Sequence, residues 1–250
     1  MRKDASRMAV IEHIALEPGM EYVLRRGFGN RKELRPRIRE LLQVTLEEVR
    51  EKRLLQPRVA YREYGVIEVL QEGFRLAGGA VLRCEPFSSR FPRPRGLVTA
   101  VCTIGPALER QVSLNLRRGE QLKGFLLDAV GSAAVDMLAA ETCRLVKEAL
   151  GRGIGVSSPV SPGMDGFSLS GQADLLALAG AGRIGVRLTS GGMLNPRKSL
   201  SMLLGIGAGM PRWTPEEVCE RCPLAAQCPY RLQAAEKAPQ AEAVPKAIPK

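Results

Sequence analysis

Residues 97–151 read LVTAVCTIGPALERQVSLNLRRGEQLKGFLLDAVGSAAVDMLAAETCRLVKEALG, and the hydrophobic pattern changes within them. Residues 97–104 are an apolar run, which predicts a strand. Gly105-Pro106 marks the change to helix, because proline is favoured at a first helical position. Apolar residues then recur at helical spacing over 107–116, which predicts a short amphipathic helix. The stretch therefore begins with a strand that feeds directly into a helix.

The second half of this stretch predicts a long helix that ends at Gly151. Apolar side chains recur every three or four residues from Leu122 to Val146. Residues 129–134 are mostly small, so we expect another backbone to approach the helix closely there. Asp128 and Asp136 lie two turns apart on one face, and we expect them to be solvated or capping carboxylates.

The rest of the chain adds helices and strands in blocks. Residues 31–54 predict an amphipathic helix with Pro36 in its first turn. Further elements are a helix that starts near Ser168 and strands at 66–70, 79–82, 154–158, 184–189 and 199–206. This order favours an α+β domain over a doubly wound sheet. Residues 233–250 lack an apolar period, which predicts a disordered tail after a single domain of residues 1–232.

Composition excludes several classes of protein. The chain has 250 residues, of which 45% are hydrophobic and 25% charged, so wholesale disorder and a fibrous protein are excluded. Aromatic residues make up only 4%, which argues against a stacking platform for single-stranded nucleic acid. Neither a signal-peptide core nor a run of about 18 apolar residues occurs, so we expect a cytoplasmic protein without a membrane partner.

The net charge of +11 is concentrated in one segment. Residues 25–62 carry twelve basic side chains against five acidic ones. Such a run is usually a solvated helix face, and the alternative is a docking patch for phosphate or for an acidic protein. Both interpretations stay open at this point, with the solvated face favoured.

A cysteine motif near the end of the chain is the strongest local signal. Cys219, Cys222 and Cys228 follow a C-x2-C-x5-C spacing, which brings three thiols within ten residues. In a reducing compartment clustered cysteines indicate a metal more often than a disulfide. Zinc and an iron-sulfur cluster both fit sulfur ligation, with the cluster slightly favoured, and both usually take four ligands. Cys84, Cys102, Cys143 or a partner would supply the fourth.

Two glycine-bearing turns follow predicted strands. The first contains Ser161, Pro162, Gly163 and Met164, and the second runs from Thr189 to Pro196. Glycine permits close approach of a ligand to the backbone, so these turns are candidate walls of a groove for a small polar ligand. No catalytic residue is assigned, because His13 is the only histidine and no nucleotide-binding fingerprint occurs.

Several strings around these turns carry a family resemblance. They include Thr103-Ile104-Gly105-Pro106, Leu127-Asp128-Ala129-Val130-Gly131-Ser132, Ser161-Pro162-Gly163, Ile184-Gly185-Val186-Arg187-Leu188-Thr189, Pro196-Arg197-Lys198-Ser199 and the cysteine motif with Tyr230-Arg231. In this order they resemble the reactivation domain of cobalamin-dependent methionine synthase, and most closely its stand-alone relatives in anaerobic bacteria. The resemblance covers roughly residues 20–231.

The resemblance implies a C-shaped α+β domain with a twisted antiparallel sheet. It also implies binding of S-adenosylmethionine, and covering of a corrinoid while cob(II)alamin is reduced and remethylated. This chain would contact cobalamin only when the cobalamin is carried by a partner protein. The family's arginine and tyrosine around the Pro-Gly correspond here to Pro159 and Met164, and Ser190 stands where an acidic residue is expected. We therefore expect weak S-adenosylmethionine binding or none.

Two functions follow as hypotheses. The first is an accessory protein that supports reductive activation of a corrinoid-binding protein or a cobalamin-dependent methyltransferase. The alternative is a metal-binding basic adaptor that engages nucleic acid through residues 25–62. The low aromatic content and the lack of a known reading motif argue against this alternative.

Overall fold

The computed structural model describes residues 8–28, 35–84, 94–151, 153–164, 167–220, 222, 224–228 and 231. The predicted tail, residues 233–250, lies outside them. The helices are α1 (Met20–Gly27), α2 (Pro36–Glu51), α3 (Ala107–Arg117), α4 (Gln121–Leu150), α5 (Gln172–Ala179) and α6 (Pro215–Glu220), with short 3-10 turns η1 (Leu169–Gly171) and η2 (Ala181–Ile184). The strands are β1 (Met8–Glu12), β2 (Arg58–Leu70), β3 (Gly73–Leu76), β4 (Val81–Arg83), β5 (Gly96–Thr103), β6 (Arg187–Leu188), β7 (Leu194–Asn195) and β8 (Ser199–Ile206).

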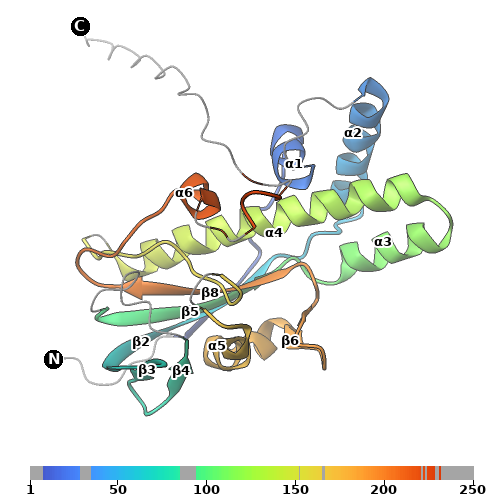
Figure 1. Ribbon diagram of the computed structural model, residues 1–250. Coiled ribbons are helices and arrows are strands. Elements are labelled where there is room, and N and C mark those ends of the chain that lie inside the picture. Colours follow the sequence, from blue (N-terminus) through green and yellow to red (C-terminus); the bar gives the residue numbers. More distant parts are fainter. Residues whose placement is uncertain are drawn as a thin grey trace, which may run out of the picture.

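One antiparallel sheet organises the described part of the chain. Its order is β4-β3-β2-β5-β8, with β1 paired to the first half of β2. The sheet curls as a half-barrel, and α4 crosses one face while α5 lies on the other (Figure 1). This arrangement confirms the predicted α+β class, the antiparallel sheet and the long central helix.

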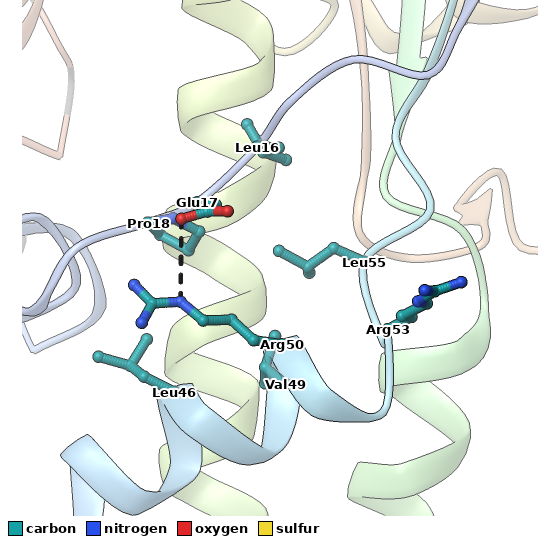
Figure 2. Close-up of a pocket in the computed structure, with 8 residues that line it drawn as sticks. All are labelled: Leu16, Glu17, Pro18, Leu46, Val49, Arg50, Arg53 and Leu55. Carbon is teal, nitrogen blue, oxygen red and sulfur yellow. Dashed lines mark ion pairs between the residues drawn. The ribbon is translucent and has the colours of Figure 1, made fainter.

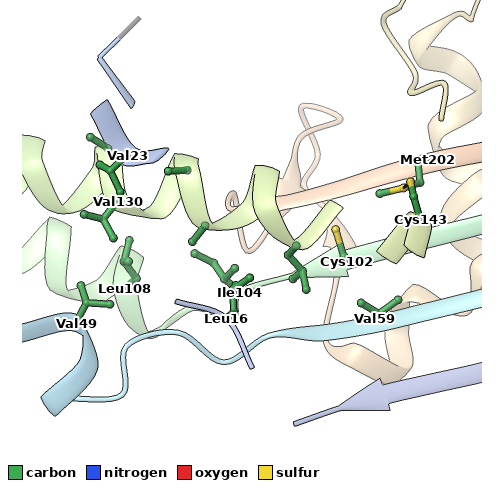
Figure 3. Close-up of a cluster of buried hydrophobic side chains, with 14 of the residues drawn as sticks. Leu16, Val23, Val49, Val59, Cys102, Ile104, Leu108, Val130, Cys143 and Met202 are labelled. Atoms are coloured by element: carbon green, nitrogen blue, oxygen red, sulfur yellow. Dashed lines mark hydrogen bonds between the residues drawn. The ribbon is translucent and has the colours of Figure 1, made fainter. Parts of the chain in front are cut away.

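Side chains alternate between the two faces of β5, which is buried along its whole length. Val98, Ala100 and Cys102 join the main hydrophobic cluster on the α4 side. Leu97 and Val101 join two smaller clusters on the opposite side. Figure 3 shows the main cluster, where Cys143 on α4 lies 3.8 Å, sulfur to sulfur, from Met202 on β8. The central strands are therefore held from both faces, which makes them a rigid base for the loops at their ends.

The small residues of α4 have the predicted effect. A Cβ added to Gly27 of α1 would lie 2.9 Å from the Ala129 Cβ, so the two helix backbones are nearly in contact. A Cβ added to Gly131 would lie 2.7 Å from the Leu108 Cδ2 of α3. The predicted close approach of another backbone at residues 129–134 is confirmed at Ala129, and at Gly131 the close neighbour is a side chain of α3.

One predicted strand is wrong and another is shorter than predicted. Residues 154–158 make only isolated bridges to β8, at Val156 and at nearby Val160. Pro159 has no N–H to donate, and the Ser157 hydroxyl accepts a hydrogen bond from the Gly205 N–H, so a regular ladder does not form. Within 184–189, Gly185 adopts a φ of 77°, which confines the strand to Arg187–Leu188.

Two N-terminal elements, β1 and α1, had no counterpart in the sequence-based expectation. In the part of the chain that the structure describes, no helix combines the length and apolar character needed to cross a bilayer.

Candidate functional site

The first glycine turn closes upon itself. It begins directly after Val160, which bridges Leu203 of β8. The Met164 N–H donates to the Ser161 carbonyl at 3.0 Å, and the Gly163 N–H donates to the Phe167 carbonyl at 2.8 Å. The Ser161 N–H lies 3.2 Å from the Met164 sulfur, which accepts it. Three amide donors of the predicted ligand-binding turn are therefore engaged inside the turn.

Met164 itself is half-buried and packs against the smaller cluster that contains Phe167. Gly163 is exposed and has a φ of 90°, so glycine suits this position. The turn is thus built to be rigid, and its most exposed residue is the glycine.

The second glycine turn is the end of a small hairpin formed by β6 and β7. The Thr189 N–H donates to the Met193 carbonyl at 2.8 Å, and the Met193 N–H donates back to the Thr189 hydroxyl at 3.1 Å. Gly192 occupies the left-handed region with a φ of 76°. After the hairpin, the buried Pro196 follows a cis peptide bond from Asn195, and its carbonyl accepts the Ser199 hydroxyl at 2.7 Å.

The two turns are anchored at different points of β8. The hairpin leads into Ser199 at the start of the strand, whereas the first turn leaves from the bridge at Leu203. Four residues of strand span about 13 Å. That both turns wall one groove stays a prediction.

A polar network joins three distant parts of the sequence around Lys198. The Lys198 Nζ donates to the Ser132 Oγ at 2.8 Å and lies 2.9 Å from the Asp128 Oδ1, both on α4. The Lys198 N–H donates to the Glu109 Oε1 on α3 at 2.6 Å. Only 15% of the Lys198 side chain is exposed, so the pair with Asp128 is partly shielded from solvent.

The network continues at the end of β5. The Ser199 hydroxyl lies 2.8 Å from the Thr103 Oγ1, which also accepts the Gly105 N–H at 3.1 Å. The start of β8, the end of β5 and helices α3 and α4 are thus bound together by side chains from three of the strings quoted above. Beside the network is a cavity of about 350 Å³, lined by Arg26, Gly27, Phe125, Asp128, Ala129 and Ser132.

Asp128 and Asp136 are partly solvated, as expected, and each also has a charged partner that the sequence did not predict. Asp128 pairs with Lys198, and Asp136 accepts the Tyr22 hydroxyl at 2.5 Å and lies 2.7 Å from the Arg26 Nε. Burial and the neighbouring Asp136 raise the pKa of Tyr22. The reason is tertiary: α1 packs on α4 at Gly27 and brings its polar side chains over this face.

The cysteine motif begins within α6, which contains Cys219, and continues beyond the helix as turns. The Cys222 N–H donates to the Cys219 carbonyl at 3.2 Å, which is the tight turn expected between the first two cysteines. Cys222 is exposed, whereas Cys219 and Cys228 are half-buried. Across the described ranges, no group of three or more His, Cys, Asp or Glu side chains is arranged to hold a metal ion. As placed, the three cysteines do not fit zinc or an iron-sulfur cluster.

The other cysteines lie in the hydrophobic clusters and do not join the motif. Burial raises the pKa of Cys84 and of Cys102 to about 12, and that of Cys143 to about 11. A thiol with such a pKa is protonated at neutral pH in the metal-free protein. Within the described ranges none of these three cysteines belongs to a group arranged to hold a metal ion.

The comparisons with known proteins find similarity among solved structures. No family model matches the sequence, and no curated protein matches it either. Among solved structures the chain is similar to the crystal structure of the MetH reactivation domain bound to AdoHcy. The TM-score is 0.59 at 11% sequence identity, over 86% of this chain and 83% of that chain. At this identity the likeness shows a shared fold.

About half of the described basic side chains in the basic segment are paired with a carboxylate. Five of its side chains lie within 4.0 Å of a carboxylate oxygen: Arg26, Arg39, Arg50, Lys52 and Arg58. Paired cations release fewer counterions on phosphate binding than unpaired ones would. The pairing supports the solvated-face interpretation over a phosphate-binding patch.

Proposed function

We propose that this protein is an accessory protein of corrinoid-dependent methyl transfer, which docks on a corrinoid-carrying partner and supports its reductive activation. The observation that carries the proposal is the fold shared with the MetH reactivation domain over most of both chains. The sequence strings that resemble the same family add to it, because three of them meet around Lys198. The partner would be a corrinoid-binding protein or a cobalamin-dependent methyltransferase.

In this proposal the cobalt chemistry belongs to the partner. One-electron reduction to cob(I)alamin is very unfavourable, and methyl transfer draws it forward, so the corrinoid must be held and shielded meanwhile. The buried sheet and α4 provide a rigid body for that task.

We also propose that residues 1–232 form one domain of this type, with the cysteine motif at its end. Titration of a cob(II) corrinoid protein with this chain, followed by heat and by the corrinoid spectrum, tests the proposal.

We expect weak S-adenosylmethionine binding or none. Pro159 and Met164 stand where the resembling family has an arginine and a tyrosine. Proline carries no charge and cannot form the paired hydrogen bonds with a carboxylate that a guanidinium forms. The internal hydrogen bonds of the turn, including the one from the Ser161 N–H to the Met164 sulfur, support this expectation. Equilibrium dialysis with S-adenosylmethionine and with S-adenosylhomocysteine measures it. A micromolar or tighter dissociation constant would contradict it.

Metal binding by Cys219, Cys222 and Cys228 also stays a prediction, and it requires their side chains to gather when the metal binds. Anaerobically purified protein should then contain stoichiometric iron or zinc, and a chelator should expose Cys222 to a short iodoacetamide pulse. The buried Cys102 is the internal control, because a pKa of about 12 lowers its thiolate fraction about a thousandfold relative to the ordinary value of 9. Absence of both metals, with Cys222 labelled equally before and after chelation, would end the metal hypothesis.

A further inference from the structure

A separate pocket lies between the loop that precedes α1 and the end of α2. Its volume is about 260 Å³, which is about the share of eight to nine liquid waters. Figure 2 shows Leu16, Glu17 and Pro18 on one side of it and the last turns of α2 on the other. Leu46 and Val49 line its floor and belong to the main hydrophobic cluster. The pocket thus leads from solvent to the apolar core.

The charged side chains of this pocket leave positive charge in excess. Arg50 and Arg53 both line it, and Glu17 is the one acidic lining residue. The Arg50 Nε is 4.0 Å from the Glu17 carboxylate, too long for a hydrogen bond, and 52% of the Arg50 side chain is exposed. Within the described ranges no ion pair involves Arg53, which stands on the opposite side of the pocket from Arg50 (Figure 2).

Arg53 has an unusual backbone conformation for its residue type. Its φ is 49°, in the left-handed region where glycine is the usual residue. Its N–H donates to the Arg50 carbonyl, and the Leu54 N–H donates to the Val49 carbonyl, which is the Schellman ending of a helix. Glycine would end α2 here at no steric cost, so an arginine in this place points to a use for its guanidinium.

We propose that this pocket binds a small organic anion, with a carboxylate or phosphate head group and a short apolar body. Arg50 holds the head group, because guanidinium groups form strong charge-assisted hydrogen bonds with either oxyanion. Glu17 competes for Arg50 and is displaced on binding. The apolar body lies against Leu46 and Val49, and Arg53 raises the positive potential at the opposite rim. The site is independent of the proposed corrinoid function.

Calorimetric titration of the full chain with three six-carbon probes tests the proposal. Hexanoate and hexyl phosphate carry the two head groups, and hexanol is the neutral control. We expect one or both anions to bind at least tenfold more tightly than hexanol, and more weakly as salt is raised. The anion that binds more tightly assigns the head group.

Variants then locate the site. Arg50→Gln should weaken anion binding about tenfold or more, since a charge-assisted hydrogen bond is lost. Glu17→Gln should strengthen it, because it removes the competing carboxylate. Arg53→Gly should weaken binding several-fold while leaving the thermal midpoint equal or higher, so loss of binding there cannot come from unfolding. Arg39→Gln, an exposed arginine on the same helix that pairs with Glu21, is the matched control and should change nothing.

Three outcomes would overturn the proposal. Neither anion binds, or hexanol binds as tightly as they do, or Arg50→Gln and Arg39→Gln have the same effect. None of these experiments contains a corrinoid protein, so their failure is distinct from failure of the proposed function.

Discussion

Replacing Leu138 with Ala should lower the free energy of unfolding by about 2–5 kcal/mol, because the substitution leaves a cavity between α4 and the sheet. The Leu138 side chain is 0% exposed and belongs to the main hydrophobic cluster. For a chain of this size the thermal midpoint should fall by roughly 4–20 °C. Leu122→Ala is the matched control on the same helix, because that side chain is 43% exposed and should cost far less. Equal losses for the two variants would show that α4 is not packed as described.

Gly171→Ala should lower the free energy of unfolding by about 1–3 kcal/mol through a steric clash. The added Cβ would lie 2.2 Å from the Arg83 carbonyl oxygen and 2.7 Å from the Phe167 ring. The backbone of Gly171, with a φ of −75°, suits alanine, so the loss would come from the clash alone. Phe167 anchors the first glycine turn, which should also lose protection from amide hydrogen exchange.

Gly182→Ala provides the matched control for this second variant. Nothing lies within 4 Å of a Cβ added there, so stability should be unchanged or slightly raised. A Gly171→Ala protein as stable as Gly182→Ala would contradict the close contact between the start of α5 and β4.

Elements with a strong local pattern were predictable from the sequence. The helix that ends at Gly151 carries its period over thirty residues, and the helical spacing alone places it correctly. The buried run at 97–104 likewise matches β5, since a strand covered on both faces is apolar throughout. In both cases the signal lies within the segment itself.

Elements that depend on tertiary contacts were not predictable. The eight residues of α1 include three with charged side chains, and only two of the eight, Val23 and Gly27, are buried. Its helix is stabilised where Gly27 meets Ala129 of α4, about a hundred positions away. Residues 154–158 show the opposite case, because Pro159 and the Ser157 hydroxyl interrupt a strand that the apolar pattern favours.

The candidate site was predictable only in part. The two glycine turns exist, and glycine has a positive φ in each, but their hydrogen bonds are mostly internal. The Lys198 network went unrecognised because its members are 66 and 89 positions apart in the sequence. A sequence signal is present nonetheless, since Thr103, Asp128 and Lys198 lie in strings that carry the family resemblance.

Binding to a corrinoid protein tests the central claim most directly. The measurement is a calorimetric titration of this chain into a cognate corrinoid protein, in its cob(II) and methylated forms, with the corrinoid spectrum recorded in parallel. Random duplex DNA in a low-salt gel shift serves as the control for non-specific attraction to the net charge of +11. We predict saturable binding that is tighter for the cob(II) form, together with a change in its spectrum. No heat and no spectral change with either form would contradict the account.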